Sequence, residues 1–375
     1  MSSSPIILYD GWALAYHPSS WEAIHLLSLL SLLPTGVRAQ VALPASPFEP
    51  LLPGVESILQ QTPDTPWGWL NWEQRILLRL ARERGANLLH WMGTRAALFG
   101  SIPQLISPAG YNARLETRLV SAIGSPAEAS RTNDLSDRLR LAMGQGGSSR
   151  AVGLCWPNDL PEPGPGIRVF KLPPLAHPRF TATIQTPPLP DLPETYILYH
   201  GPHSDRALHR LVQAWSWATG PIGEYYPLLV LGLDRAGAAR LNAILDQAGL
   251  SKTVSLLPPL PLESTIYLYQ HCTAVFHPAE APVWGSPLRS ALICGKPLVA
   301  LETRLSDALA GPAAYLIHPN RPDANRALGA ALITVIVEED VATRLAQAGR
   351  ERSKGWHNNN FTAALEEVYH SLADS

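Results

Sequence analysis

Short apolar runs alternate with longer amphipathic stretches through the first half of the chain. Short runs rich in Val, Ile and Leu are typical of buried strands, and apolar residues repeating every three or four positions are typical of helices. The pattern predicts strands over residues 5–9, 39–43, 87–91, 104–107 and 151–155, and helices over residues 21–33 and 72–84. This alternation of strand and helix is typical of a parallel βαβ sheet.

The same alternation starts again after residue 194 and continues to the end of the chain. It predicts strands over residues 195–200, 227–232, 253–257, 274–277, 297–300 and 314–317, and helices over residues 205–219, 236–248, 262–270, 287–294, 323–337 and 361–372. A chain of 375 residues also exceeds the size at which a single core usually keeps growing. The sequence therefore predicts an α/β protein with two Rossmann-like, doubly wound parallel sheets.

Proline marks the boundary between the two halves, because the 36 prolines concentrate around residues 44–66 and 157–193. The expected parts are a first domain over residues 1–180, a proline-rich linker over 181–194, a second domain over 195–360 and a closing helix over 361–375. Ligands of such sheets bind where loops leave the carboxyl ends of the strands. We therefore expect the site in a cleft that the two domains face.

Composition and charge exclude several classes of protein. Hydrophobic residues make up 46% of the chain and the formal net charge is −2, without a dense run of Lys and Arg, so we expect a folded protein that does not bind nucleic acid. The amino terminus lacks the basic segment of a signal peptide, and the longest apolar stretch, residues 23–33, is too short to cross a bilayer. Three cysteines without disulfide or metal spacing favour the cytoplasm. Contact with a membrane surface and the oligomeric state stay open.

The most specific motif runs Trp284-Gly-Ser-Pro-Leu-Arg-Ser-Ala-Leu-Ile-Cys-Gly-Lys-Pro-Leu-Val-Ala300. This motif resembles part of the second domain of retaining glycosyltransferases of the family-4 type, whose fold is GT-B. The resemblance also includes residues 196–201, 228–232, 254–260 and 267–278. Residues 88–93 and 105–111 resemble the acceptor-binding domain of the same family. The resemblance implies a nucleotide-diphospho-sugar donor held by the second domain as substrate, a glycan or lipid-linked acceptor, and no metal or other cofactor.

The motif contains its own signal for the start of a helix. Ser286 is a preferred N-cap and Pro287 a preferred first helical residue, and both follow Gly285. A diphosphate at this helix start would meet unpaired N–H groups and partial positive charge. An ordinary helix start without a ligand explains the same residues. The resemblance places Gly201 near the same diphosphate.

Several positions depart from the family pattern on the donor side. Pro282 and Ser290 stand where the family uses two glutamates, and Pro202 follows Gly201 where an arginine is usual. Glu280 is the nearest substitute carboxylate, although a surface carboxylate without a role is the favoured explanation. Arg206 stands where a lysine is usual, and an arginine can hold phosphate oxygens in a bidentate fork. The alternative interpretation is a solvent-exposed arginine at the start of a helix.

The first domain offers fewer candidates. Ala109 stands where the family has a catalytic-site histidine. His90 and His17 are the alternative candidates for catalysis, although a lone histidine is more often structural. The loop residues expected on the acceptor side are Asp10, Gly11 and Gly110, since a glycine directly after a first strand allows close approach of a ligand. Trp67, Trp69, Trp72 and Trp91 are expected mainly in the core rather than as faces for stacking sugars.

The leading hypothesis is a cytoplasmic glycosyltransferase that transfers a sugar from a nucleotide sugar to a glycan or lipid-linked acceptor. The alternative is a homologue that keeps the fold, has lost the chemistry and acts as a binding or scaffold partner, because Pro282, Ser290, Pro202 and Ala109 together remove the usual polar groups. A sugar-nucleotide isomerase of similar architecture would need a pair of catalytic carboxylates, which the sequence does not offer.

Overall fold

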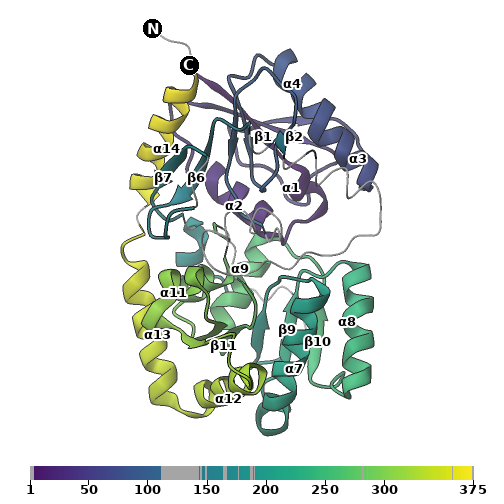
Figure 1. Cartoon of the computed structure of the whole chain (residues 1–375), viewed down its shortest axis with the longest axis vertical. Helices are drawn as coiled ribbons and strands as arrows, with labels where there is room; N and C mark the ends of the chain where they lie inside the picture. The colour runs from purple at the N-terminus through teal and green to yellow at the C-terminus, as the bar shows by residue number, and fades with distance from the viewer. Residues whose placement is uncertain are drawn as a thin grey trace. The chain divides into compact units, whose positions relative to one another are not determined.

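The computed structural model describes residues 4–110, 143, 146–147, 150–163, 167–175, 177–185, 189, 191–280, 283–284, 286–356 and 358–373. The chain divides into two compact units. Unit 1 comprises Met1–His177, Pro282–Gly285 and Trp356–Ser375, and unit 2 comprises Pro178–Ala281 and Ser286–Gly355. Each unit is a parallel sheet covered by helices, as Figure 1 shows.

Unit 1 contains a seven-stranded sheet in the order β3-β2-β1-β4-β5-β6-β7, and all of its pairings are parallel. The strands are β1 Ile6–Asp10, β2 Arg38–Leu43, β3 Glu56–Leu59, β4 Leu88–Trp91, β5 Gln104–Ile106, β6 Gly153–Pro157 and β7 Val169–Leu172. The helices are α1 Trp12–Tyr16, α2 Trp21–Leu30, α3 Pro66–Asn71, the π-helical turn Trp72–Ile76, α4 Leu77–Glu83 and α14 Asn358–Ala373. The predicted sheet of the first half is confirmed.

Two strands of unit 1 are absent from the sequence prediction, and both lie at the edges of the sheet. The edge strands β3 and β7 fall within the two proline-rich stretches. In β3 only Ile58 is buried, so this strand shows no apolar run. The predicted helix over residues 72–84 also starts too late. Thr65 caps it through the backbone N–H of Gly68 and Pro66 opens it, so the helical region begins one to two turns earlier.

The last helix of the chain, α14, belongs to unit 1 and packs against β4 and β7 (Figure 1). Phe361, Leu365 and Tyr369 are fully buried in the same core as Ile7 and Tyr9 of β1. Burial of large apolar side chains is the main favourable contribution to folding. The core of unit 1 is therefore built from both ends of the chain.

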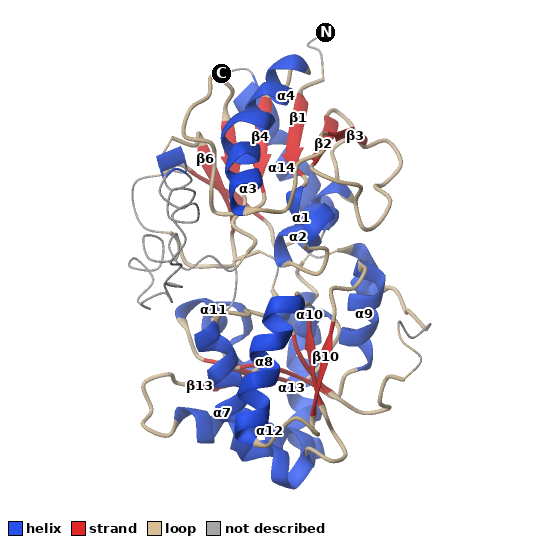
Figure 2. Ribbon diagram, turned by 90° about the vertical axis from the view of Figure 1, so that its right-hand side faces the viewer, coloured by secondary structure: helices blue, strands red, loops and turns tan. Residues whose placement is uncertain are grey.

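Unit 2 contains a six-stranded parallel sheet in the order β10-β9-β8-β11-β12-β13. The strands are β8 Ile197–Tyr199, β9 Leu228–Leu231, β10 Val254–Leu257, β11 Ala274–His277, β12 Leu298–Leu301 and β13 Tyr315–Ile317. The helices are α7 Asp205–Ile222, α8 Arg235–Ala248, α9 Leu262–His271, α10 Pro287–Ile293, α11 Arg304–Ala310, α12 Ala324–Val337 and α13 Glu339–Ser353. Every predicted strand of this half is present, whereas α11 and α13 were not predicted. Figure 2 shows the helices packed around the strands.

Both sheets have the doubly wound topology, in which the strand order reverses once. The reversal lies between β1 and β4 in unit 1 and between β8 and β11 in unit 2. The loops that leave the carboxyl ends of these strands diverge, and the resulting crevice is where such folds bind ligands. Residues just after β1, β4, β8 and β11 are therefore the first places to look for a site.

Candidate functional site

A small cavity of about 80 Å³ lies in unit 1 where the loops leave β1 and β4. Its lining combines carboxylates, cations and indole rings. The lining residues are Asp10, Trp12, Ala13, His17, Ser20, Glu22, Trp69, Glu73, Trp91, Met92, Gly93 and Arg95. Aromatic faces beside carboxylates are suited to hold a hydroxylated ring, because the rings stack and the carboxylates accept hydrogen bonds.

Asp10, the last residue of β1, has one satisfied and one unsatisfied carboxylate oxygen. Its Oδ1 accepts hydrogen bonds from the Trp72 Nε1 at 2.9 Å and from the Trp12 backbone N–H at 3.0 Å. Within the described part of the chain, Oδ2 has no hydrogen-bond partner. Burial raises the pKa of Asp10 to about 6, although the hydrogen bond from Trp72 opposes this effect. Near neutral pH this carboxyl is thus poised to accept a hydrogen bond or a proton from a ligand.

Two tryptophans form a stacked wall of this cavity. The rings of Trp12 and Trp69 lie 5.4 Å apart with an angle of 9° between their planes. The Trp12 Nε1 is buried and has no hydrogen-bond partner among the described residues. Arg95 lies over the Trp69 ring at 4.9 Å and pairs with Glu73 at 3.8 Å, in a place where both charged side chains are largely buried. Cation–π contact and ion pairing together fix this wall.

Of the predicted first-domain candidates, Asp10 and His17 line this cavity, and Gly11 and Gly110 lie beside its lining residues. His17 lines it directly and lies 6.1 Å from the Trp69 ring. A Cβ at Gly11 would come within 2.5 Å of the Ala42 carbonyl oxygen, so glycine is needed where the first loop crosses β2. A Cβ at Gly110 would come within 1.5 Å of the Glu22 carboxylate, so glycine leaves the space in which Glu22 lines the cavity.

His90 lies in the core and not at the cavity. Its Nδ1 is hydrogen-bonded to the Tyr369 hydroxyl at 2.8 Å and its Nε2 to the Ser107 hydroxyl at 2.8 Å. Burial lowers the pKa of His90 well below its usual value, and the nearby His25 adds to the effect. This neutral, fully enclosed histidine joins β4 to α14. Ala109 is also fully buried.

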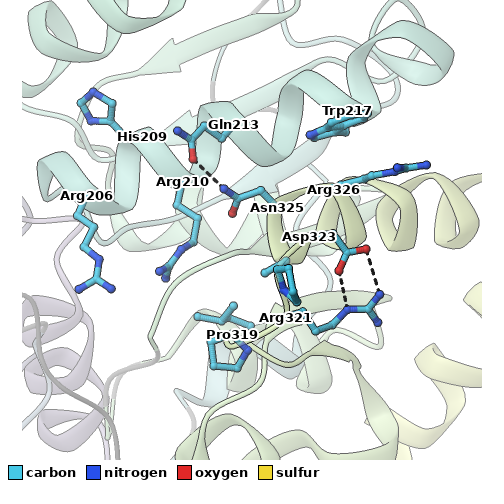
Figure 3. A pocket seen from close by; sticks show the side chains of 13 residues that line it. Arg206, His209, Arg210, Gln213, Trp217, Pro319, Arg321, Asp323, Asn325 and Arg326 are labelled. Carbon is cyan, nitrogen blue, oxygen red and sulfur yellow. Dashed lines mark hydrogen bonds and ion pairs between the residues drawn. The ribbon is translucent and has the colours of Figure 1, made fainter.

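On the unit 2 side, the loop after β8 carries Gly201, which has a positive φ of 63° and precedes a cis bond to Pro202. Arg206 follows in the first turn of α7 and is exposed. It lines a larger cavity together with Arg210, which Figure 3 shows from close by. Arg206 can therefore reach a ligand at the carboxyl-end edge of the sheet.

The loop after β11 leads to α10. His277 ends β11 and donates from Nε2 to the backbone carbonyl of Glu280 at 3.0 Å, and burial lowers the pKa of His277 to about 4. This bond fixes the backbone at Glu280, whose side chain is half-buried. Ser286 caps α10 by accepting from the Leu288 N–H at 3.2 Å, Pro287 opens the helix, and Ser290 is buried one turn later.

Two predicted positions, Pro282 and Gly285, lie outside the described residues. Between them, Trp284 is buried in unit 1. Its ring stacks on His25 with centroids 5.0 Å apart, and its Nε1 donates to the Cys155 carbonyl at 2.9 Å. Trp284 is therefore a core residue.

The sequence reading missed several residues that line the two cavities. Trp12 directly follows the Asp10-Gly11 pair, so its position after the first strand was an available signal. Glu73 and Arg95 come from α3–α4 and from the loop after β4, and no local pattern joins them. Outside both cavities, Arg289 of α10 is only 2% exposed, which is unusual for an arginine and could not be inferred from the motif. Among the described residues, no group of three His, Cys, Asp or Glu side chains could hold a metal ion.

Comparison with protein families places a known domain on unit 2. Residues 189–352 match the family model of glycosyl transferases group 1. The match covers nearly all of unit 2. This domain includes β8 to β13 and the residues predicted on the donor side. No curated protein matches the chain.

Solved structures extend the likeness from the group 1 domain to the whole chain. Sucrose-phosphate synthase from Thermosynechococcus elongatus has a TM-score of 0.68 at 16% identity, over 99% of this chain and 100% of that one. WaaG, a glycosyltransferase involved in lipopolysaccharide biosynthesis, has a TM-score of 0.68 at 13% identity, over 97% and 99%. HepE from Anabaena, solved with UDP and glucose, has a TM-score of 0.58 at 14% identity, over 98% and 100%. The predicted GT-B fold is confirmed.

Proposed function

We propose that this protein is a cytoplasmic glycosyltransferase that moves a sugar from a nucleotide-diphospho-sugar to a glycan or lipid-linked acceptor. The observation that carries the proposal is the group 1 glycosyltransferase domain, which covers residues 189–352 and so nearly all of unit 2. The structural neighbours support it: HepE is solved with UDP and with UDP-glucose, and WaaG acts in lipopolysaccharide biosynthesis.

In this proposal the donor diphosphate meets Arg206 and the loop that carries Gly201, both just after β8. A guanidinium stabilises charge that develops on the leaving phosphate, which is the main electrostatic contribution expected in such transfers. The start of α10 at Ser286 adds backbone N–H groups. We expect no metal to be needed, because the arginine supplies the positive charge.

The cavity at Asp10 supplies the acceptor side of the proposal. A hydroxyl group of the acceptor enters this small cavity and donates to Oδ2 of Asp10, beside the wall formed by Trp12 and Trp69. The scaffold alternative rests on Pro282, Ser290, Pro202 and Ala109. The family match and the structural neighbours favour the transferase.

Donor binding is the first step to test. Thermal stability is measured against a panel of nucleoside diphosphates and nucleotide sugars, because a ligand that binds only the folded state raises the midpoint. We expect one nucleotide to raise the midpoint, and its sugar donor to be slowly hydrolysed in the absence of acceptor and in the presence of EDTA. Arg206→Ala should weaken binding about tenfold or more.

Arg235→Ala is the matched control, since Arg235 is an exposed arginine of the same unit that does not line the cavity. A folded protein whose midpoint responds to none of these ligands at millimolar concentration would contradict the proposal and favour the scaffold. Donor hydrolysis that disappears with EDTA would contradict the metal-independent part alone.

A further inference from the structure

A second cavity, of about 630 Å³, lies within unit 2 (Figure 3). It is lined by α7, by Leu301 at the end of β12, and by residues 319–326, which follow β13 and begin α12. The loops after β8, β12 and β13 all leave the same edge of a parallel sheet. This is the edge at which doubly wound sheets bind ligands, and the volume is within the usual range of small-molecule sites.

Positive charge is concentrated in this cavity. Its described lining contains four arginines, Arg206, Arg210, Arg321 and Arg326, and one acid, Asp323. Asp323 is paired with Arg321 through two contacts of 3.0 and 3.2 Å. Four cations and one anion leave a local charge of +3, in a chain whose formal net charge is −2. The excess is a specific feature of this place and does not reflect the composition of the chain.

Arg210 is the least satisfied of these cations. In the described part of the chain it has neither a hydrogen bond nor an ion pair. Asp205, the acid at the start of the same helix, pairs with Arg240 of α8 at 3.3 Å. Arg206 lies four positions before Arg210, a spacing at which like charges on a helix repel. Figure 3 shows both side chains extending from the same side of α7, with Arg210 directed towards the loop at Pro319.

The far end of the cavity has a different character. Trp217 lies two turns after Arg210, about 10 Å along α7, and is 52% exposed. The Arg326 guanidinium lies 5.3 Å from the centre of its ring. Between the two ends, the side-chain amides of Gln213 and Asn325 are hydrogen-bonded at 2.7 Å. One end is therefore suited to an anion and the other to a ring or a polar organic group.

We propose that this cavity binds a small organic phosphate, with its phosphate held by Arg206 and Arg210 and its organic part directed along α7 towards Trp217. Paired guanidinium forks match the oxygens of a phosphate, and the bound anion would remove the repulsion between the two arginines. The proposal does not depend on glycosyl transfer. The site shares Arg206 with the proposed donor site, so the two ligands would compete for this arginine, and it differs from the donor site in its use of Arg210, Trp217 and the loop after β13.

Isothermal titration of the full chain at low salt tests the proposal, with glucose 6-phosphate and inorganic phosphate as probes. We expect both to bind, the sugar phosphate more tightly. Arg210→Ala should weaken both by about tenfold or more, and Arg210→Gln should do the same. Trp217→Ala should reduce the affinity for glucose 6-phosphate to that for inorganic phosphate. Arg344→Ala, an exposed arginine of α13 outside the cavity, should change nothing.

Two controls make the outcome decisive. The Arg210→Ala variant without ligand should keep or slightly raise its melting midpoint, because a repulsion is removed; a clear fall would show a structural role and overturn the proposal. UDP should bind the variant as it binds the unchanged protein, and an equal loss of UDP and phosphate binding would make this cavity the donor site.

Two further results would overturn the proposal. Equal affinity for glucose 6-phosphate and inorganic phosphate, unchanged in Trp217→Ala, would remove the organic part of the assignment. Binding to vesicles that contain phosphatidylglycerol, without binding of either soluble probe, would show a membrane-facing basic surface and no phosphate site.

Discussion

At the scale of single residues, the ionised carboxylate of Asp10 lowers the stability of the folded protein. Its Oδ1 accepts hydrogen bonds from the Trp72 indole and the Trp12 backbone, and its Oδ2 has no partner among the residues that the structure describes. The pKa of Asp10 is raised from 3.8 to about 6, so the charged form is less favourable in the folded protein than in water. A group that ionises at a cost to folding is typical of a site whose charge is used in binding or catalysis.

Asp10→Asn tests this cost. Since the folded protein holds the proton more tightly than the unfolded chain, the stability due to this group is complete below pH 3.8, falls as the pH rises to about 6, and is absent above it. Asparagine keeps the acceptor for Trp72 and cannot ionise. At pH 8 the variant should therefore be more stable by about 1–3 kcal/mol, and this part of the pH dependence should vanish.

Urea unfolding between pH 4 and 8 measures the effect, and sugar transfer with the donor identified above should fall about a hundredfold or more. Met92→Leu, a substitution of similar volume at another residue that lines the cavity, controls for nonspecific effects on its shape. An Asp10→Asn variant that is destabilised at pH 8 and fully active would show that the carboxylate has a purely structural role.

At the scale of elements, the link between α14 and the first sheet depends on a short chain of buried polar groups. The Tyr369 hydroxyl is hydrogen-bonded to the Tyr9 hydroxyl of β1 and to the His90 Nδ1 of β4, both at 2.8 Å. The remaining ring nitrogen of His90 is hydrogen-bonded to Ser107. Buried polar groups in such a chain are costly to leave unpaired, so each member fixes its neighbours.

Tyr369→Phe keeps the ring of this residue and removes its hydroxyl. Tyr9 and His90 then each lose a partner inside the core, and we expect unit 1 to be destabilised by about 1–3 kcal/mol. Chemical unfolding followed by circular dichroism measures the change. Tyr225→Phe is the control, because Tyr225 is 70% exposed and belongs to unit 2. Equal effects of the two substitutions would refute the role of the buried chain.

The elements that the sequence predicts well are those that carry an apolar run. All six strands of unit 2 carry apolar runs, and all six were predicted. The edge strands β3 and β7 bury fewer side chains and lie among prolines. Their sequences therefore contain no apolar run from which a strand could be predicted. Helix α13 was missed because its composition is strongly polar, with only Leu345, Ala346 and Gly349 buried.

The candidate sites were less predictable than the sheets, and the reason is physical. Asp10 and Gly11 could be singled out, since residues after a first strand lie at a fixed place in this fold. The stacked wall could not, because Trp12 and Trp69 are far apart in the sequence and meet only through packing. Trp69 was expected mainly in the core, and it lines the cavity instead. The cavity lined by Arg206 and Arg210 likewise joins α7 with a loop that comes more than one hundred residues later in the sequence.

At the scale of the whole molecule, the two units differ in how the chain builds them. Unit 2 is formed by Pro178–Ala281 and Ser286–Gly355, with one short excursion. Unit 1 needs three separate pieces, of which the last carries Phe361, Leu365 and Tyr369 into its core. None of the described helices has the length and hydrophobicity needed to cross a membrane.

A chain that ends at Gly355 separates the contributions of the two units. It keeps all of the described core of unit 2 but removes α14, so unit 1 loses several fully buried side chains, each worth about 2–5 kcal/mol. Because a domain is stable by only about 5–15 kcal/mol, unit 1 should unfold while unit 2 still melts cooperatively and binds its nucleotide. Calorimetry with and without nucleotide measures this. A peptide of residues 356–375 should partly restore the lost transition, and a truncated chain that melts like the full one would show that α14 adds nothing essential to the core.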